Sequence, residues 1–174
     1  LQQSEAYMEA LRGDQISMIF QEPNAALNPI MRIGDQVAES FMFHRQGEMC
    51  RQVVRDLASG DIKGVGPLGG LLKGLYELKA TSPHHPLFKL LKRLPVLKRW
   101  DRLMHAEALK RSVEIIAKLG IANADEIIKR YPHNLSGGMK QRIDIAIALA
   151  CSPVLLIADA ATSTLVVTIQ AQIL

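Results

Sequence analysis

Ser136, Gly137 and Gly138 stand directly before a run of residues with helical spacing. Serine is a favourable N-cap, and the two glycines let a ligand come close to the bare backbone. The unpaired N–H groups and the dipole at a helix N-terminus attract anions such as phosphate. A serine-capped helix with a flexible entry is the simpler interpretation. Gln141 follows in the same helix, and an apolar strand ends at Asp159 some 23 residues after Ser136. These additions favour the phosphate-binding interpretation.

The elements that must position these residues alternate between strand and helix patterns. Apolar runs at 16–20 and 154–158 predict two buried strands of a parallel sheet. Breakers follow the first run, with a loop at 24–29. Helices are predicted at 4–12 (ended by Gly13), 33–42, 48–58, 106–119 (ended by Gly120), 124–130 and from Ser136 onward. Apolar faces are formed by Ile33, Val37 and Phe41 in one helix and by Met139, Ile143, Ile147 and Ala150 in another.

Length and composition restrict the class of protein. The 174 residues, 48% hydrophobic and 22% charged, indicate one globular domain with a real core. The sequence has no stretch of 18 apolar residues and no signal-peptide pattern. Cys50 and Cys151 lie far apart, and His84–His85 has no further ligand at metal spacing, so the histidines are interpreted as loop residues. The net charge of +4 is compatible with an anionic ligand or a membrane surface, but it is diagnostic of neither.

Composition changes between about residues 59 and 105, which we interpret as an insertion. Residues 60–74 are rich in Gly and Leu, and residues 81–86 hold two prolines and two histidines. The stretch 87–102 is basic and amphipathic, contains Trp100, and is interrupted by Pro95. It suits contact with anionic lipid or a membrane partner. A solvated hairpin that packs its leucines on neighbouring helices is the favoured interpretation.

Several motifs resemble one family in identity, order and spacing. Leu135–Arg142 resembles the signature motif of ABC ATPases, Val154–Asp159 resembles their Walker B strand, and Ile16–Gln21 resembles the strand that leads to the Q-loop. The peptide/nickel importer branch is the most similar. The pieces that carry this are Ile19–Pro23, Leu27–Pro29, Ile33–Gln36, Tyr131–His133 and Val167–Leu174. The resemblance does not cover the insertion.

The resemblance implies a set of site residues, with ATP and Mg²⁺ as cofactors. Ser136, Gly137 and Gly138 would contact the γ-phosphate of ATP held by an opposite subunit, with Gln141 beside them, which implies a head-to-tail dimer. Gln21 would reach the Mg²⁺ and the attacking water, because its amide both donates and accepts. Asp159 would hold Mg²⁺ through water, since hard cations take oxygen ligands. As residues alone, Gln21 and Asp159 are also compatible with a polar strand end and a helix-capping turn.

The fold implied is α/β, a fragment of an ABC nucleotide-binding domain with a partial parallel sheet and a helical subdomain. Its parts would be residues 1–23 (core strand and Q-loop), 24–149 (helical subdomain with the signature motif) and 150–174 (Walker B strand and D-loop region). The implied function is coupling of ATP binding and hydrolysis to the import of a peptide or related small solute. The implied partners are a second ATPase subunit, transmembrane permease subunits and, indirectly, a solute-binding protein, with no nucleic acid. The implied location is the cytoplasmic face of the cell membrane.

Departures from the family leave two functions open. Ala160 stands where the family has its general base, a Glu, so no catalytic residue is intact there. Ala161 and Val166 also replace the usual residues. The alternative is therefore a hydrolysis-deficient relative that acts as a structural or regulatory partner. A third class, DNA-repair and chromosome-maintenance ATPases, is disfavoured because no sustained heptads separate Gln21 from Ser136.

Further features suggest a partial chain. The sequence contains no phosphate-cradling P-loop motif of the form Gly-x-x-x-x-Gly-Lys-Ser/Thr, which the family carries upstream of the Q-loop. It begins with Leu rather than Met and stops at Leu174 without a helix stop signal. Within the signature helix, Asp144 occupies a position that is usually apolar or small. We expect it to pair weakly with Lys140 one turn back.

Overall fold

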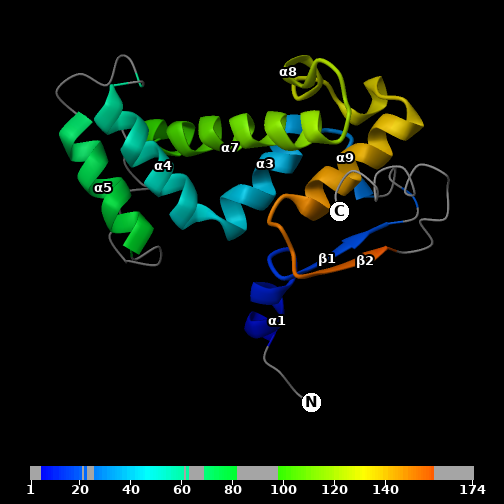
Figure 1. Ribbon diagram of the computed structural model, residues 1–174, viewed down its shortest axis with the longest axis horizontal. Helices are drawn as coiled ribbons and strands as arrows, with labels where there is room; N and C mark the ends of the chain where they lie inside the picture. The colour runs from blue at the N-terminus through cyan, green and yellow to red at the C-terminus, as the bar shows by residue number, and fades with distance from the viewer. Residues whose placement is uncertain are drawn as a thin grey trace. The chain divides into compact units, whose positions relative to one another are not determined.

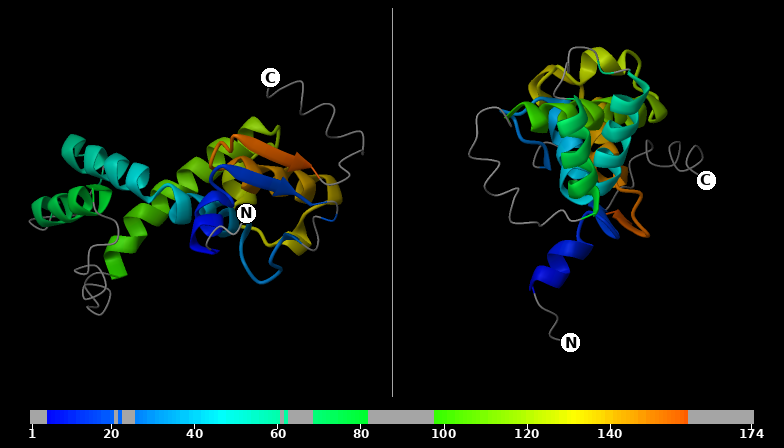
Figure 2. Two further views of the ribbon diagram at one scale, coloured as in Figure 1. Left: turned by 90° about the horizontal axis from the view of Figure 1, so that it is seen from below. Right: turned by 90° about the vertical axis from the view of Figure 1, so that its left-hand side faces the viewer.

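The computed structural model describes residues 5–20, 22, 26–60, 62, 69–81 and 98–158. These residues form two compact units (Figures 1 and 2). Unit 1 comprises residues 1–40 and 109–174, and unit 2 comprises residues 41–108. The boundaries fall inside two continuous helices, α3 (Ile33–His44) and α7 (Lys98–Lys118). Each unit is described by itself below.

The remaining elements follow the predicted alternation of helix and strand. They are α1 (Glu5–Leu11), β1 (Ile16–Ile19), α4 (Gln46–Ser59), α5 (Gly69–Thr81), α8 (Ala124–Ile127), the 3₁₀ turn η3 (Pro132–Asn134), α9 (Gly137–Leu149) and β2 (Leu155–Ala158). The α/β class predicted from the sequence is confirmed. Among the described helices, none is long and apolar enough to cross a bilayer.

The two strands of unit 1 are neighbours in a parallel sheet, as predicted. β1 and β2 run side by side in Figure 1, with Ile16 opposite Leu155 and Ile19 opposite Ala158. Parallel neighbours require a crossover connection, because each strand must start at the same edge of the sheet. The helices between the two strands in sequence provide this return path.

The prediction that both strands are buried is wrong for β2 and half right for β1. All four β2 residues are exposed, and Val154 just before them is 89% exposed. In β1, Ser17 and Ile19 are buried, whereas Met18 on the opposite face is exposed. Helix α9 packs against β1. A strand needs cover on both faces to be fully buried, and the described residues do not provide it here.

Helix α3 begins in unit 1 and is anchored at its N-terminus by another segment. The N–H groups of Ile33 and Gly34 donate to the carbonyl oxygens of Arg130 and Ile128, both at 2.9 Å. The first N–H groups of a helix have no partner within it, so these carbonyls act as its cap. Ile33 and Val37 are fully buried, as their spacing predicts. Helix α8 ends at Ile127 and not at 130, because the chain tightens there: the N–H groups of Lys129 and Arg130 donate to the carbonyl oxygens three residues earlier, at Glu126 and Ile127.

Gln36 on α3 fastens the preceding loop. Its side-chain carbonyl accepts the N–H of Asn28 at 2.9 Å, and its amide nitrogen donates to the carbonyl oxygens of Asn28 and Met31, each at 3.0 Å. The residue is buried, so these bonds satisfy polar atoms that water does not reach. The loop that follows the first strand therefore has one fixed conformation from Asn28 onward.

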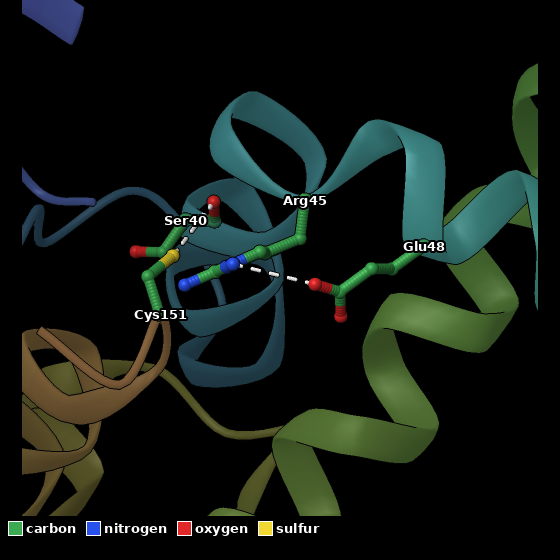
Figure 3. A network of polar contacts seen from close by, with 4 residues as sticks. All are labelled: Ser40, Arg45, Glu48 and Cys151. Atoms are coloured by element: carbon green, nitrogen blue, oxygen red, sulfur yellow. Dashed lines mark hydrogen bonds and ion pairs between the residues drawn. The ribbon is translucent and has the colours of Figure 1, made fainter. Parts of the chain in front are cut away.

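The end of α9 is also tied to α3. The thiol of Cys151 lies 3.5 Å from the carbonyl oxygen of Ser40 and donates to it (Figure 3). Cys151 is buried and forms no disulfide, as expected for a small apolar residue. The contact joins the segment leading into β2 to the last turn of α3 that belongs to unit 1.

Unit 2 is built around α4, α5 and the first half of α7. Helices α4 and α5 lie against each other (Figure 1). The core side chains are Met49, Cys50, Val53, Tyr76 and Met104, all at most 1% exposed.

Polar contacts in unit 2 involve both sulfur atoms and charged groups. The thioether of Met104 accepts from the Cys50 thiol at 3.6 Å and from the Lys79 ammonium at 3.5 Å. Burial raises the pKa of the Cys50 thiol to about 11, although Lys79 and Arg51 act in the opposite direction. At the start of α4, Arg45 pairs with Glu48 at 3.3 Å (Figure 3).

The predicted insertion contains more helix than the sequence suggested. Helix α5 covers the Gly- and Leu-rich stretch from Gly69 onward, and α7 begins at Lys98 and not at 106. Packing of Tyr76 and Lys79 in the core of unit 2 outweighs the low helix propensity of the glycines. Residues 82–97, with His84, His85, Pro95 and most of the basic stretch, lie outside the described residues.

Gly34→Ala is expected to destabilise the protein. A Cβ at this position would lie 2.7 Å from the Cβ of Ile128 and 2.9 Å from Cδ2 of Leu109. Overpacking of this kind costs about 1–3 kcal/mol. Gly74→Ala is the matched control, because a Cβ there meets nothing within 4 Å. In the interior of α5 it should be neutral or gain about 0.5–1 kcal/mol. Urea unfolding followed by circular dichroism measures both, and equal midpoints would contradict the packing at Gly34.

Candidate functional site: the N-terminus of helix α9

The first turn of α9 has the geometry that the sequence predicts. Ser136 is the N-cap, with an extended backbone (φ −68°, ψ 161°), and its hydroxyl oxygen accepts the N–H of Met139 at 3.3 Å. The first intrahelical bond runs from the N–H of Lys140 to the carbonyl of Ser136. The N–H groups of Gly137 and Gly138 precede that bond, where a helix leaves donors for other partners.

The surface around this turn is open. Ser136 and Gly137 are exposed, and a Cβ built on Gly137 would meet nothing within 4 Å. Gln141 lies one turn after Gly137 on the same side of the helix and is half-buried. The structure therefore brings together four of the predicted site residues, namely Ser136, Gly137, Gly138 and Gln141. Their arrangement presents backbone donors and a helix dipole to an incoming anion.

The entry to α9 is fixed by the segment before it. Leu135 is buried and donates its N–H to the carbonyl of Pro132 at 3.1 Å, closing the turn η3. The rings of Tyr131 and His133 stack at 5.6 Å, which agrees with a structural role for the histidine. The burial and the hydrogen bond of Leu135 therefore fix the backbone immediately before the exposed cap Ser136.

Arg142 ties α9 to the end of α7. Its guanidinium donates to the carbonyl oxygens of Leu119 at 3.2 Å and Gly120 at 2.9 Å. Gly120 has a φ of +72°, the left-handed conformation that ends a helix, as its position predicted. The last carbonyls of a helix lack partners within it, and a cation is favourable there. Arg142 is therefore a structural member of the motif, directed away from the glycines towards α7.

Gln21 and Asp159, the predicted metal ligands, lie outside the described residues, as does Ala160. The structure does place the residues that precede the first two. Ile19 pairs with Ala158 in the sheet, so the carboxyl ends of β1 and β2 meet at one edge. Across the described part of the chain, no group of three or more His, Cys, Asp or Glu side chains forms a metal site. The Mg²⁺ role of Gln21 and Asp159 stays a prediction.

The partner of Asp144 differs from the one expected from the sequence, which was Lys140. The carboxylate does not pair with Lys140. Its Oδ2 accepts the backbone N–H of Phe20 at 3.2 Å, from a residue 124 positions away. Asp144 is only 4% exposed, and this burial raises its pKa, although the bond from Phe20 acts in the opposite direction. Sequence spacing has no means of finding a partner so distant. The sequence contains one indication of a buried polar contact, namely a charged residue next to Ile143 on the apolar side of the helix.

Comparison with known proteins shows the family of this chain. A family model described as "ABC transporter" matches residues 2–163. This chain belongs to the ABC transporter family. Among solved structures, it is similar to the ATP-binding cassette MJ0796, a dimer in a post-hydrolysis state bound to ADP and Pi. The TM-score is 0.55 at 19% identity, covering 98% of this chain and 50% of the other, so that likeness supports the fold alone.

Curated relatives include ATP-binding proteins named for the transport or import of peptides and glutathione. The chain is 35% identical over 164 residues to the oligopeptide transport ATP-binding protein AppD of Bacillus subtilis, covering 94% of this chain and 33% of AppD. It is 35% identical to the glutathione import ATP-binding protein GsiA of Salmonella choleraesuis, covering 99% of this chain and 19% of GsiA. It is 35% identical to the dipeptide transport ATP-binding protein DppD of Lactococcus lactis, covering 95% of this chain and 32% of DppD. The chain thus spans between a fifth and a third of the length of these relatives.

Asp144→Asn is expected to raise stability at neutral pH. The amide keeps an acceptor for the Phe20 N–H and removes the buried charge. Because the folded-state pKa of Asp144 is raised, its contribution to stability is fully present below the ordinary value of 3.8 and is lost as pH rises through the folded-state value. The advantage of the variant should therefore shrink as pH falls.

Urea unfolding midpoints measured from about pH 3 to pH 7 test this linkage. Asp125→Asn is the control, because Asp125 is exposed in the same unit. Parallel stability curves for Asp144→Asn and the wild type would show that the Asp144 carboxylate is not desolvated in the folded protein.

Proposed function

We propose that this chain provides the signature side of an ATP site in the ATP-binding subunit of an ABC importer for peptides or related small solutes. One observation carries the proposal. In a member of the ABC transporter family, Ser136 caps α9 and leaves Gly137 at an exposed helix N-terminus. The names of AppD and DppD, ATP-binding proteins of oligopeptide and dipeptide transport, support the substrate class, and the name of GsiA, a glutathione import ATP-binding protein, supports import.

The proposed chemistry is electrostatic. The N–H groups of Gly137 and Gly138 donate to the γ-phosphate of an ATP that an opposite subunit holds, and the Ser136 hydroxyl and Gln141 line the same place. The donors are fixed before the nucleotide arrives, so little ordering is needed on binding. Because this chain donates to a nucleotide bound elsewhere, the proposal includes a head-to-tail dimer. The solved ATP-binding cassette MJ0796, whose fold this chain shares, is itself a dimer.

The proposed metal side uses the carboxyl edge of the sheet. Gln21 follows β1 and Asp159 follows β2, and the pairing of Ile19 with Ala158 supports their proximity. We assign them to Mg²⁺, with Asp159 acting through water. Oxygen donors from a carboxylate and an amide suit this hard cation. The bound metal would supply charge neutralisation at the phosphates.

The proposed partners follow from the importer assignment. Residues 24–149 would form a helical subdomain that docks on the cytoplasmic loops of permease subunits, between the sheet residues 1–23 and 150–174. A solute-binding protein would act through the permease. The chain would then work at the cytoplasmic face of the membrane. The insertion at 59–105, which includes α5, adds helical surface on that subdomain.

A second candidate is a hydrolysis-deficient ABC relative that acts as a structural or regulatory partner. Ala160 favours it, since alanine offers no proton acceptor at the position of the general base. Such a subunit would still donate Ser136 and the two glycines to ATP held by its partner.

The signature role predicts a response to MgATP. Millimolar MgATP, added together with an ATP-binding partner such as AppD, should shift the amide NMR signals of Ser136, Gly137, Gly138 and their neighbours. Adenosine without phosphates, added with the same partner, should not. Ser136→Asp keeps a good N-cap but places a negative charge against the phosphate, so the response should be lost. Ser136→Asn keeps the cap without the charge, so it should respond like the wild type.

The two variants make the result specific, because both preserve the fold of α9 through the cap. Equal shifts in Ser136→Asp and Ser136→Asn would show that the nucleotide does not bind at this helix end. Shifts confined to other parts of the chain would have the same meaning.

Ala160 predicts a loss of turnover in a complete site. A chimaera in which this chain replaces the matching stretch of AppD would supply the missing P-loop. Its steady-state ATP hydrolysis should be about 10²–10⁴-fold below that of the same chimaera with Ala160→Glu, the usual contribution of a general base. MgATP binding should be equal in the two.

The hydrolysis assay separates the two candidate functions. Equal, rapid hydrolysis with Ala160 and with Glu at this position would remove the hydrolysis-deficient relative from consideration. Slow hydrolysis with Ala160 and recovery with Glu would support it.

A further inference from the structure

The hydrogen bond between Asp144 and Phe20 joins the two parts of the proposed site. Phe20 is the residue immediately before Gln21, and its side chain is 51% exposed, so its own packing does little to hold it. Ile19 is the last residue of the β1 ladder. The Phe20 N–H therefore lies one residue beyond the sheet, and Oδ2 of Asp144 binds it at 3.2 Å.

Asp144 is a rigid extension of the signature turn. It lies seven residues after Gly137 in one unbroken helix, which corresponds to about 10 Å along the axis. The same helix packs directly on β1. A bond from Asp144 to Phe20 thus links the strand exit to the helix that carries Ser136.

Stability alone is a poor explanation for this carboxylate. Among the described residues, the Asp144 carboxylate accepts one hydrogen bond, from Phe20. Burial of a charged group costs desolvation free energy that one such bond does not fully return. Asp144 is itself only 4% exposed, so an apolar side chain at this position would meet little water. An apolar residue at 144 would pack there but would leave the Phe20 N–H without its acceptor.

We propose that Asp144 is a positioning residue, which holds the backbone of Phe20, at the exit of β1, at a fixed place relative to Ser136. Its significance for nucleotide binding rests on the function proposed above. The positioning itself does not, because it is a property of the chain without nucleotide.

Spin labels measure the positioning directly. One label goes on Glu22→Cys, at an exposed residue beyond Gln21, and the other on Asn134→Cys, at an exposed residue just before Ser136. Cys50 and Cys151 are at most 1% exposed and should remain unlabelled in the folded chain. The distance distribution between the two labels, measured by pulsed electron resonance, should be narrow in the wild-type background.

Two substitutions of Asp144 separate positioning from packing. Asp144→Ala removes the acceptor, so the distribution between labels at 22 and 134 should broaden or shift. Asp144→Asn retains an acceptor and should restore the narrow distribution. A control pair on Ala117→Cys and Asn134→Cys, both exposed and away from β1, should not respond to either substitution. An unchanged distribution in Asp144→Ala, or a broad one in Asp144→Asn, would overturn the proposal.

If Asp144→Ala does not fold, Asp144→Ser takes its place, because its hydroxyl is one bond shorter and falls short of Phe20. The hydrogen bond is also open to direct measurement in the wild type, as a scalar coupling between the Phe20 amide nitrogen and the Asp144 carboxyl carbon. Its absence in the folded chain would equally overturn the proposal. None of these measurements uses ATP, so a negative MgATP response would count against the proposed function alone.

Discussion

The parallel pairing of β1 with β2 is the constraint on which unit 1 depends. Two strands that run the same way cannot be joined by a tight turn, so the chain must leave the sheet after Ile19 and return before Leu155. All the helices from α3 to α9 lie in that excursion. The pairing also fixes which residues meet at the carboxyl edge, because Ile19 stands opposite Ala158. The edge that precedes Gln21 and Asp159 is therefore set by backbone hydrogen bonds between distant segments.

Polar groups from distant segments form hydrogen bonds with backbone N–H and C=O groups at or near the ends of helices and strands. The carbonyl of Arg130 accepts from the first turn of α3, and the guanidinium of Arg142 binds the last carbonyls of α7. Gln36 fastens the loop before α3, and Asp144 binds the N–H beyond β1. Each bond satisfies a backbone group that a helix or ladder leaves without a partner. Unit 1 is thus held together at its element ends as well as through its apolar core.

Sequence reasoning succeeded where the determinants are local. The Ser136 cap, the left-handed Gly120 and the apolar face beginning at Ile33 depend on neighbours within a few residues, and all were predicted. It failed where tertiary contacts decide. Helix α5 forms despite its glycines because Tyr76 fills the core of unit 2, and the partner of Asp144 is far away in sequence. The exposure of β2 depends on what covers a sheet, which a short apolar run does not encode.

These contacts suggest separate roles for the signature turn, for Gln21 and for Asp144 in the proposed site. In the proposed function, Ser136 and the glycines would act on a nucleotide that another subunit holds, so their role would not require an acid at position 160 of this chain. Gln21 would act on the metal side, and Asp144 binds the N–H of Phe20, the residue before Gln21. Burial of the Asp144 carboxylate costs desolvation free energy, and packing alone would not explain why a carboxylate binds the Phe20 N–H. A requirement that the strand exit and the helix N-terminus keep one geometry would explain it, because a directional hydrogen bond fixes position in a way that apolar contact does not.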